Sequence, residues 1–278
     1  MYEPDIAVIG GGPAGLMAAA TAARAGATVL LLERDGHLGG QLVKQTHKFF
    51  GSDKQHASTR GIKIAKILSD ELALLPDRVT VWTGATVLGL YEDGMVTVDH
   101  EGAYRKIRPG RIIVATGASE KYLSFPNNDL PGIYGAGAVQ TLMNVYGVRP
   151  GKRVLMIGAG NIGLIVSYQL LQAGVEVAAI VEGLPTIGGY LVHASKIRRA
   201  GVPILTSHTI VRADGSHCVE SALIAKVDRS WNIVPGTIHK IDCDVICVSV
   251  GLSPLAELLW QAGCDMPYIK ELGGHVPA

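Results

Sequence analysis

The sequence lacks an excess of charge of either sign, and aromatic side chains are scarce. Its 278 residues include 25 Lys and Arg against 24 Asp and Glu, and aromatic residues make up 5% of the chain. There is no basic block and no Lys/Arg stripe along a predicted helix, so nucleic acid and acidic membranes find little to bind. A small-molecule partner is therefore favoured over nucleic acid.

Cysteines and metal-ligand patterns are also sparse. The four cysteines, Cys218, Cys243, Cys247 and Cys264, all lie in the last quarter of the chain and form no C-x-x-C pair. We expect them to be reduced, buried and structural. Cys243 and Cys247 are predicted four residues apart on one strand, about 13 Å, which is too far for a disulfide. The nine histidines include no H-x-H or H-x-x-x-H pair, so no metal or iron–sulfur site is predicted.

No apolar stretch has the character of a membrane span. Residues 6–23 and 154–175 contain no Asp, Glu, Lys or Arg over about the length that crosses a bilayer. Each is interrupted by glycines just after a short β-like run, and that break exposes backbone groups that lipid cannot satisfy. We expect a buried strand, a turn and a helix in each. Residues 1–5 lack the basic region of a secretory signal, so the expected location is cytoplasmic.

Glycine, in contrast, is abundant. The chain contains 35 glycines, and hydrophobic residues make up 48% of it. That apolar content is sufficient for a core and excludes disorder, while the glycines indicate many tight backbone turns. The composition favours α/β architecture.

The N-terminal segment carries a recognisable βαβ pattern. Residues 5–9 form an apolar strand run, residues 10–15 spell G-x-G-x-x-G, and residues 16–25 form an Ala-rich helix followed by glycine. A second strand run at 27–32 ends in Glu33. Strand, glycine turn, helix, strand and acid together make the dinucleotide-binding fingerprint.

The same pattern recurs in the second half of the chain. Residues 153–157 lead into G-x-G-x-x-G at 158–163, a helix extends to Ala173, and the next strand ends in Glu182. The acid follows the first glycine by 23 residues in the first copy and by 24 in the second. This context makes each glycine motif far more specific than it is alone.

The two halves also correspond beyond the acids. Residues 37–42 (His-Leu-Gly-Gly-Gln-Leu) parallel residues 186–191 (Thr-Ile-Gly-Gly-Tyr-Leu), and residues 111–117 parallel residues 244–251. Before each of the latter strands comes short β-like material with hairpin signals, at residues 79–107 and 204–241. The sequence therefore predicts an α/β chain of two Rossmann-like, three-layer dinucleotide-binding domains, each with an inserted β-meander.

These motifs resemble the two-dinucleotide-binding flavoproteins of the pyridine nucleotide-disulfide oxidoreductase-like superfamily, whose first unit binds FAD and whose second binds NAD(P)H. Residues 39–42, 44–50 and 131–137 resemble the branch without a redox dithiol. That branch includes the large subunits of opine oxidase, dye-linked proline dehydrogenase and hydrogen cyanide synthase, and the NAD-binding part of heterotetrameric sarcosine oxidase. The resemblance implies an FAD-binding domain from 1–123 with 250–278, and an NAD(H)-binding domain from 124–249.

The first glycine turn is predicted to hold the FAD pyrophosphate. Without a Cβ at Gly10, Gly12 and Gly15, the backbone can turn sharply, approach a phosphate and pack the helix on the strand. The N–H groups of the helix N-terminus carry about half a positive charge. Glu33 then accepts hydrogen bonds from the adenosine ribose, unless it is simply a solvated strand-end acid.

The resemblance implies further contacts around this first site. Arg34 would cover the adenine, and Gln41 would lie near the flavin unless it is an ordinary polar loop residue. His47 and His56 either approach the flavin or are solvated loop histidines. The remaining expected contacts are Pro13, Ala14, Gly40, Thr116 and Gly117.

The second turn is predicted to hold NAD(H). Gly158, Gly160 and Gly163 correspond to Gly10, Gly12 and Gly15 of the first motif. Glu182 decides which nucleotide binds, because its carboxylate would repel a 2′-phosphate. Residues 183–192 contain no Lys or Arg to offset that repulsion. NAD(H) is therefore favoured over NADP(H), the alternative being an adenine nucleotide such as ATP that merely occupies the site. Further expected contacts are Asn161, Ile162 and Gly251.

The sequence thus predicts an FAD-dependent oxidoreductase that transfers hydride between NAD(H) and flavin, as a subunit of a larger dehydrogenase or oxidase acting with a small-molecule electron donor or acceptor. The cofactors carry this chemistry, so no catalytic side chain is assigned. The alternative is a non-catalytic subunit that holds FAD and an adenine nucleotide within a multi-subunit amine or opine dehydrogenase. Members of the resembled family continue past Ala278 into a flavin-binding segment, so we expect self-association or a partner subunit to complete the site.

Overall fold

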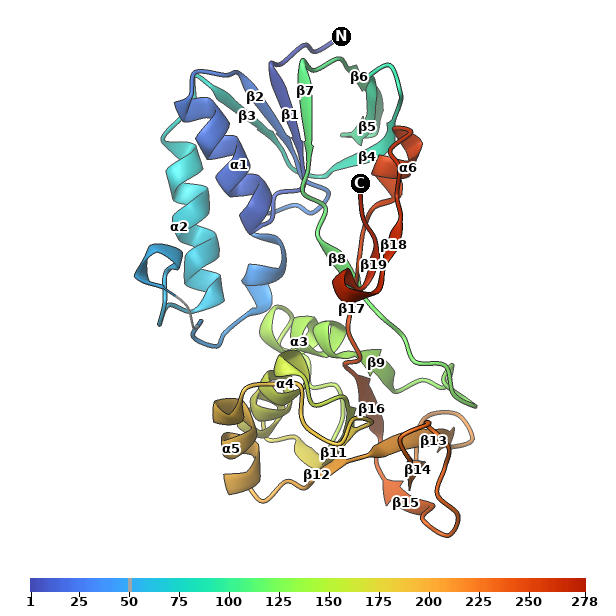
Figure 1. Cartoon of the computed structure of the whole chain (residues 1–278). Helices are drawn as coiled ribbons and strands as arrows, with labels where there is room; N and C mark the ends of the chain where they lie inside the picture. The colour runs from blue at the N-terminus through green and yellow to red at the C-terminus, as the bar shows by residue number, and fades with distance from the viewer. Residues whose placement is uncertain (50–51) are drawn as a thin grey trace. The chain divides into compact units, whose positions relative to one another are not determined.

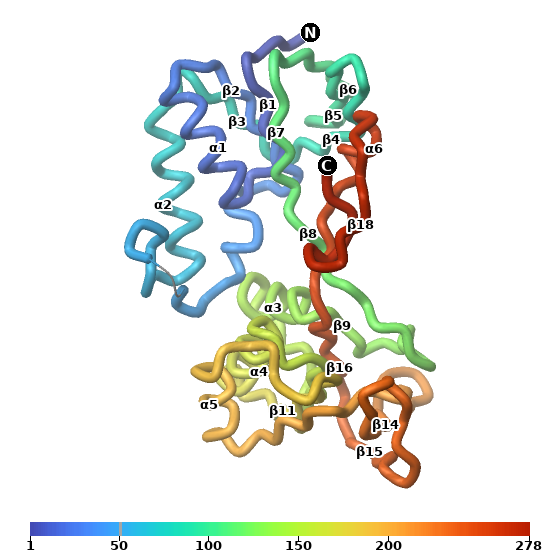
Figure 2. The backbone as a smooth tube through the Cα atoms, viewed as in Figure 1, coloured from blue at the N-terminus to red at the C-terminus, as the bar shows by residue number. Residues whose placement is uncertain are grey.

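The contacts within the computed structural model divide the chain into two units, and residues 1–49 and 52–278 are described (Figure 1). The first unit comprises residues 1–119 and 253–278, and the second comprises residues 120–252. Figure 2 shows the C-terminal residues returning to the strands of the first unit. Phe50, the last residue of the 44–50 motif, lies outside the described residues.

The first unit is built on a four-stranded parallel sheet. Its strands, in the order β3-β2-β1-β7, are Val79–Trp82, Val29–Leu32, Ile6–Ile9 and Arg111–Val114. Its helices are α1 (Pro13–Arg24) and α2 (Gly61–Ala73), with 3₁₀ turns η1 (Gly40–Lys44) and η2 (Asp53–Gln55). An antiparallel meander is formed by β4 (Ala85–Leu90), β5 (Val96–His100) and β6 (Ala103–Ile107).

Side chains alternate between the two faces of the buried strands, so this unit has three layers: the helices, the parallel sheet and the meander. Val8 and Leu31 pack with α1 and α2, whereas Ile9, Leu30 and Leu32 pack with the meander. Successive side chains on a strand point to opposite faces, so a fully apolar strand is covered on both. In Figure 1 the two helices accordingly lie on one face of the sheet and β4, β5 and β6 on the other.

The second unit repeats this plan on five parallel strands. In the order β12-β11-β10-β16-β9, they are Ile204–Thr206, Glu176–Glu182, Arg153–Ile157, Val245–Val248 and Ile133–Gly135. Its helices are α3 (Ala136–Asn144), α4 (Asn161–Gln172) and α5 (Leu191–Arg199). Its meander is β13 (His208–Asp214), β14 (Ser221–Lys226) and β15 (His239–Asp242).

The same alternation separates the two faces of the second sheet. Met156 and Ile180 belong to the cluster shared with the three helices, and Leu155 and Val181 to the cluster shared with the meander. These four side chains are at most 1% exposed. The interior of this unit is therefore as well covered as that of the first.

The remaining elements lie at the two places where the chain passes between the units and in the segment after the second. They are β8 (Ala118–Glu120), which pairs with β17 (Leu252–Pro254), followed by α6 (Glu257–Gln261), β18 (Tyr268–Ile269), η3 (Lys270–Leu272) and β19 (Gly274–His275). Gln261 at the end of α6 accepts the N–H of Leu90 at 3.1 Å and so fastens the returning chain to β4.

The predicted fold class is confirmed, with differences in detail. Residues 79–82 and 204–206 extend the parallel sheets instead of beginning the meanders. The stretches 6–23 and 154–175 each form a strand, a turn and a 12-residue helix. Among the described residues, no helix is long and apolar enough to cross a bilayer.

The cysteines differ from the prediction in two respects. All four are free, but Cys218 and Cys264 are exposed, so the expectation of burial is wrong for them. Both lie in loops outside the helices and strands, where the hydrophobic pattern of the sequence does not predict burial. Cys243 follows β15 and only Cys247 lies on β16, so the two do not share a strand as predicted. Burial raises the pKa of the Cys243 thiol to about 12 and raises that of Cys247 as well.

We predict that a thiol reagent at pH 8 modifies two of the four cysteines in the native chain. Cys218 and Cys264 are reached from solvent, whereas Cys243 and Cys247 are sterically covered and stay protonated. Ellman titration of the native protein should give about two reactive thiols, and the same titration in guanidinium four. Replacing both exposed cysteines by serine should abolish the native reaction. More than two native thiols would contradict this packing.

Candidate functional site

Two glycines of the first turn are required by the fold itself. Gly10 follows β1 with φ +109°, and a Cβ there would collide with the carbonyl oxygen of Ala115. A Cβ at Gly15 would collide with the carbonyl oxygen of Gly10. The first position therefore makes the turn beside β7, and the third lets α1 pack against it.

Gly12 is a glycine for which the fold has no need. Its φ of −74° and ψ of −178° are open to any residue. The nearest atom to a Cβ placed there is the Cα of Gly40, 4.0 Å away. The space in front of Gly12 is thus one that no described side chain fills, which is what a closely approaching phosphate group requires.

In the second turn, too, the first and third glycines are required by packing and the middle one is not. Gly158 has φ +105°, and its Cβ would collide with the carbonyl oxygen of Ser249. The Cβ of a residue at Gly163 would collide with the carbonyl oxygen of Gly158. Gly160 has φ −71° and ψ 177°, and no atom of the described residues lies within 4 Å of a Cβ built there. Both turns therefore leave room at their middle glycine.

The helices that follow the two turns are suited to receive an anion. Gly12 and Gly160 are the N-caps of α1 and α4, no side chain in the described part of the chain caps either helix, and neither first turn contains an acid. No acid within the first turn of either helix therefore offsets the partial positive charge of its N-terminus. Pro13, Ala14 and Ile162, in these first turns, are exposed, while Asn161 is half-buried.

The two acids hold the turns, a role that the sequence analysis did not anticipate. Glu33 is 8% exposed, and its Oε2 accepts the N–H of Gly11 at 2.6 Å. Glu182 is half-buried and its Oε2 accepts the N–H of Ala159 at 2.8 Å. Their second oxygens accept the N–H groups two residues onward, of Asp35 and Leu184, at 2.8 and 3.0 Å.

The matched spacing of acid and turn in the two halves indicated that each acid lies beside its turn, but not that it binds the backbone of the turn. The alternative that Glu33 is a solvated acid is wrong, because it is buried and bonded. An ionised carboxylate offers about four acceptor positions, so each acid retains capacity for ribose hydroxyls after making two backbone bonds.

The glycine pairs of the two halves lie against their turns. The N–H of Gly39 donates to the Gly11 carbonyl at 2.8 Å, and a Cβ on Gly40 would stand 2.8 Å from the Cα of Gly12. Only glycine brings this loop so near.

In the second half, the N–H of Gly189 donates to the Ala159 carbonyl at 2.9 Å. Asn161 Oδ1 accepts the N–H of Tyr190 at 2.8 Å, so its side chain fixes the loop. In each unit a second loop therefore comes close to the open position of the turn.

The other predicted residues of the first unit occupy varied positions. The Thr116 hydroxyl donates to the Leu255 carbonyl at 2.7 Å, and the Gly117 carbonyl accepts the Leu255 N–H at 3.0 Å, so both hold the returning chain. Arg34 is exposed, with its Nε 4.0 Å from Asp35 Oδ1, and Gln41 is exposed on η1.

Three predicted residues lie further from the turns in the chain. The His47 ring stacks on Phe49 at 5.0 Å between centroids. His56 follows η2 in a left-handed conformation with φ +60°. In the second unit, the Gly251 carbonyl accepts the N–H of Lys121 at 2.9 Å.

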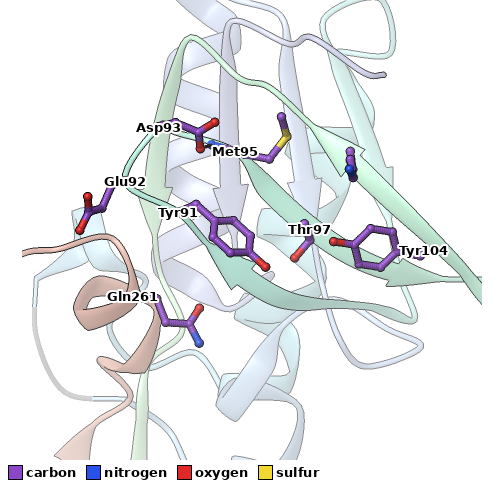
Figure 3. Close-up of a pocket in the computed structure, with 8 residues that line it drawn as sticks. Tyr91, Glu92, Asp93, Met95, Thr97, Tyr104 and Gln261 are labelled. Carbon is purple, nitrogen blue, oxygen red and sulfur yellow. Dashed lines mark hydrogen bonds between the residues drawn. The ribbon is translucent and has the colours of Figure 1, made fainter.

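A separate hollow lies on the meander of the first unit (Figure 3). Tyr91 and Tyr104 flank it, and Gln261 reaches it from α6. The buried Thr97 hydroxyl has no hydrogen-bond partner among the described residues. Neither the glycine turn nor Glu33 lines this hollow, so it is distinct from the dinucleotide-type site. Within residues 1–49 and 52–278, no three His, Cys, Asp or Glu side chains are placed to hold a metal ion.

Comparisons with known proteins show which relatives this chain resembles. The alpha subunit of sarcosine oxidase from Rhizobium meliloti (strain 1021) is 36% identical over 71% of this chain, which covers 21% of that subunit. An opine oxidase subunit from Rhizobium meliloti is 24% identical over 98% of this chain, which covers 55% of it. The chain therefore spans only about a fifth to a half of these relatives.

A solved structure shows the same fold over the whole chain. L-proline dehydrogenase from P. horikoshii matches with a TM-score of 0.71 and 24% identity, over 100% of this chain and 47% of that one. The family model described as pyridine nucleotide-disulphide oxidoreductase matches residues 4–272. With nearly every residue matched and the paired turns in place, this chain belongs to the pyridine nucleotide-disulphide oxidoreductase family.

Proposed function

We propose that this chain is the dinucleotide-binding part of an FAD-dependent oxidoreductase, with FAD at the first turn and NAD(H) at the second. The observation that carries the proposal is the open position in front of Gly12 and Gly160. The fold accounts for the other glycines of both motifs but not for these two. Space kept at two equivalent helix N-termini is suited to two pyrophosphate groups.

The assignment of the two nucleotides follows the order of the family. The first unit would hold FAD, with N–H groups at the start of α1 facing its pyrophosphate and Glu33 accepting its ribose hydroxyls. Gly40 and Gln41 lie on the loop that is closest to Gly12 and would line the rest of the cofactor. The exposed Arg34 follows Glu33 and would cover the adenine.

The second unit would hold NAD(H) through the same kind of contacts. Gly160 and the N-terminus of α4 would bind the pyrophosphate, and Glu182 the adenosine ribose. Asn161 would keep the neighbouring loop in position through its bond to Tyr190. When bound, the two cofactors supply the hydride chemistry. The chain's own contribution is to bind and orient them, and none of its side chains is assigned as an acid or a base.

We also propose that the chain works within a larger assembly. The relatives named above are subunits, and this chain spans only part of each. Tyr190, Leu191 and Val192 are three consecutive exposed apolar residues, at 62%, 72% and 45% exposure. Contiguous apolar surface on a water-soluble domain usually marks an interface. A partner subunit or a second copy of the chain would cover these residues.

We predict that the wild-type chain binds NADH more tightly than NADPH and that Glu182→Gln narrows the difference. The amide oxygen still accepts the Ala159 N–H, the bond from the Leu184 N–H is lost, and the charge that repels a 2′-phosphate is removed. A unit charge about 4 Å away is worth about 1 kcal/mol in water and more where it is partly buried, so the affinity ratio should fall by about tenfold. Calorimetric titration with both nucleotides measures the ratio.

The matched control is Glu33→Gln, which makes the same change at the other turn. It should leave the NADH to NADPH ratio unaltered. Tighter binding of NADPH by the wild type, or a ratio that responds equally to the two variants, contradicts the assignment of NAD(H) to the second turn.

The proposed reaction predicts that NADH reduces flavin on this chain. Protein loaded with FAD and freed of oxygen should lose its absorbance near 450 nm when NADH is added, and recover it in air. Loaded protein that binds NADH but keeps its absorbance would instead identify a non-catalytic nucleotide-holding subunit. Absence of NADH binding would contradict the proposed second site altogether.

A further inference from the structure

A short, closed loop of the second unit carries an unexplained tryptophan. The loop follows β14 and spans residues 228–232, with Val227 and Ile233 bridged beneath it. Oδ1 of Asp228 accepts the N–H groups of Ser230 at 2.8 Å and Asn232 at 2.9 Å. The N–H groups of Asn232 and Ser230 hold the pKa of Asp228 below its ordinary value. The ionised carboxylate thus fixes the loop around Trp231.

Trp231 is presented outward by this loop and yet touches one particular residue. Its backbone has φ +64°, a left-handed conformation that is uncommon for a bulky side chain. Its ring lies on the backbone of Gly183, because a Cβ there would stand 2.5 Å from two of the ring carbons. The residue is nevertheless 60% exposed, so much of the indole remains open to solvent.

The place where the ring lies is next to the proposed ribose site. Gly183 directly follows Glu182, the last residue of β11, which holds the second glycine turn. Adenine is joined to the same ribose whose hydroxyls this carboxylate would accept. A base on that ribose would therefore lie at the end of β11, where the Trp231 ring contacts Gly183. In the first unit the residue after the acid is Arg34 rather than glycine.

We propose that Trp231 is the surface on which the adenine of the nucleotide at the second turn stacks. This inference rests on the proposed function and adds a binding residue from a distant segment of the chain. An indole presents a large apolar face, and bases stack on such faces irrespective of their hydrogen-bonding edges. Gly183 is kept small because the indole occupies the position that a side chain would take.

The test uses ADP-ribose, which contains the adenosine, the pyrophosphate and no nicotinamide. In a chain carrying Trp82→Phe and Trp260→Phe, the remaining tryptophan fluorescence comes from Trp231, and ADP-ribose should quench it. Trp231→Ala should raise the Kd of ADP-ribose by about tenfold and Trp231→Phe by less, since a phenyl ring still stacks. The Kd of inorganic pyrophosphate should be the same in the wild type, Trp231→Ala and Trp231→Phe.

The outcomes separate this inference from the function on which it rests. If ADP-ribose binds the wild type and Gly160→Ala abolishes binding, but Trp231→Ala leaves the Kd unchanged, the stacking role is wrong and the second site stands. If ADP-ribose does not bind the wild type, the second site itself is wrong, and the stacking role with it. Thermal melting of each variant checks its folding. Should Trp231→Ala not fold, quenching in the Trp82→Phe, Trp260→Phe chain and the Kd of Trp231→Phe decide the question.

Discussion

A carboxylate at the end of the second strand holds the glycine turn in each half of this protein. Glu33 bonds to the N–H of Gly11 and Glu182 to that of Ala159. Bonds from a backbone N–H to an ionised acceptor are shorter and stronger than neutral ones, and the one to Glu33 is buried. Each of these bonds fixes the glycine turn against the neighbouring strand. The position of the turn then sets the direction of the helix N-terminus.

From this constraint follows a division among the glycines. The first and third of each motif are glycine because β1 or β10 must meet its helix without a Cβ between them. The middle glycine faces no such obstacle, and its backbone conformation is an ordinary one. The chain therefore preserves at Gly12 and Gly160 a space that serves something other than its own packing. Both units keep the same space in front of the middle glycine, although their sequences differ. The simplest explanation is that both bind ligands with the same chemical group.

The parts of this structure that local sequence could predict are those set by local physics. Strand, turn and helix at 5–25 and 153–173 follow from apolar runs and glycine spacing, and they are confirmed. The bonds made by Glu33 and Glu182 were not predicted, because spacing alone does not tell whether an acid faces ligand or backbone. Trp231 was missed altogether, since it lies 48 residues beyond Gly183 and only folding brings them together.

The most direct test of the central claim compares nucleotide binding and stability in three alanine variants. Gly12→Ala should weaken FAD binding and Gly160→Ala NADH binding, each by at least about tenfold, with melting temperatures near that of the wild type, because a methyl group fits the fold but not a bound pyrophosphate. Gly15→Ala, whose methyl group would collide with the Gly10 carbonyl, should instead lose stability. Unchanged binding of both nucleotides in the first two variants would contradict the account.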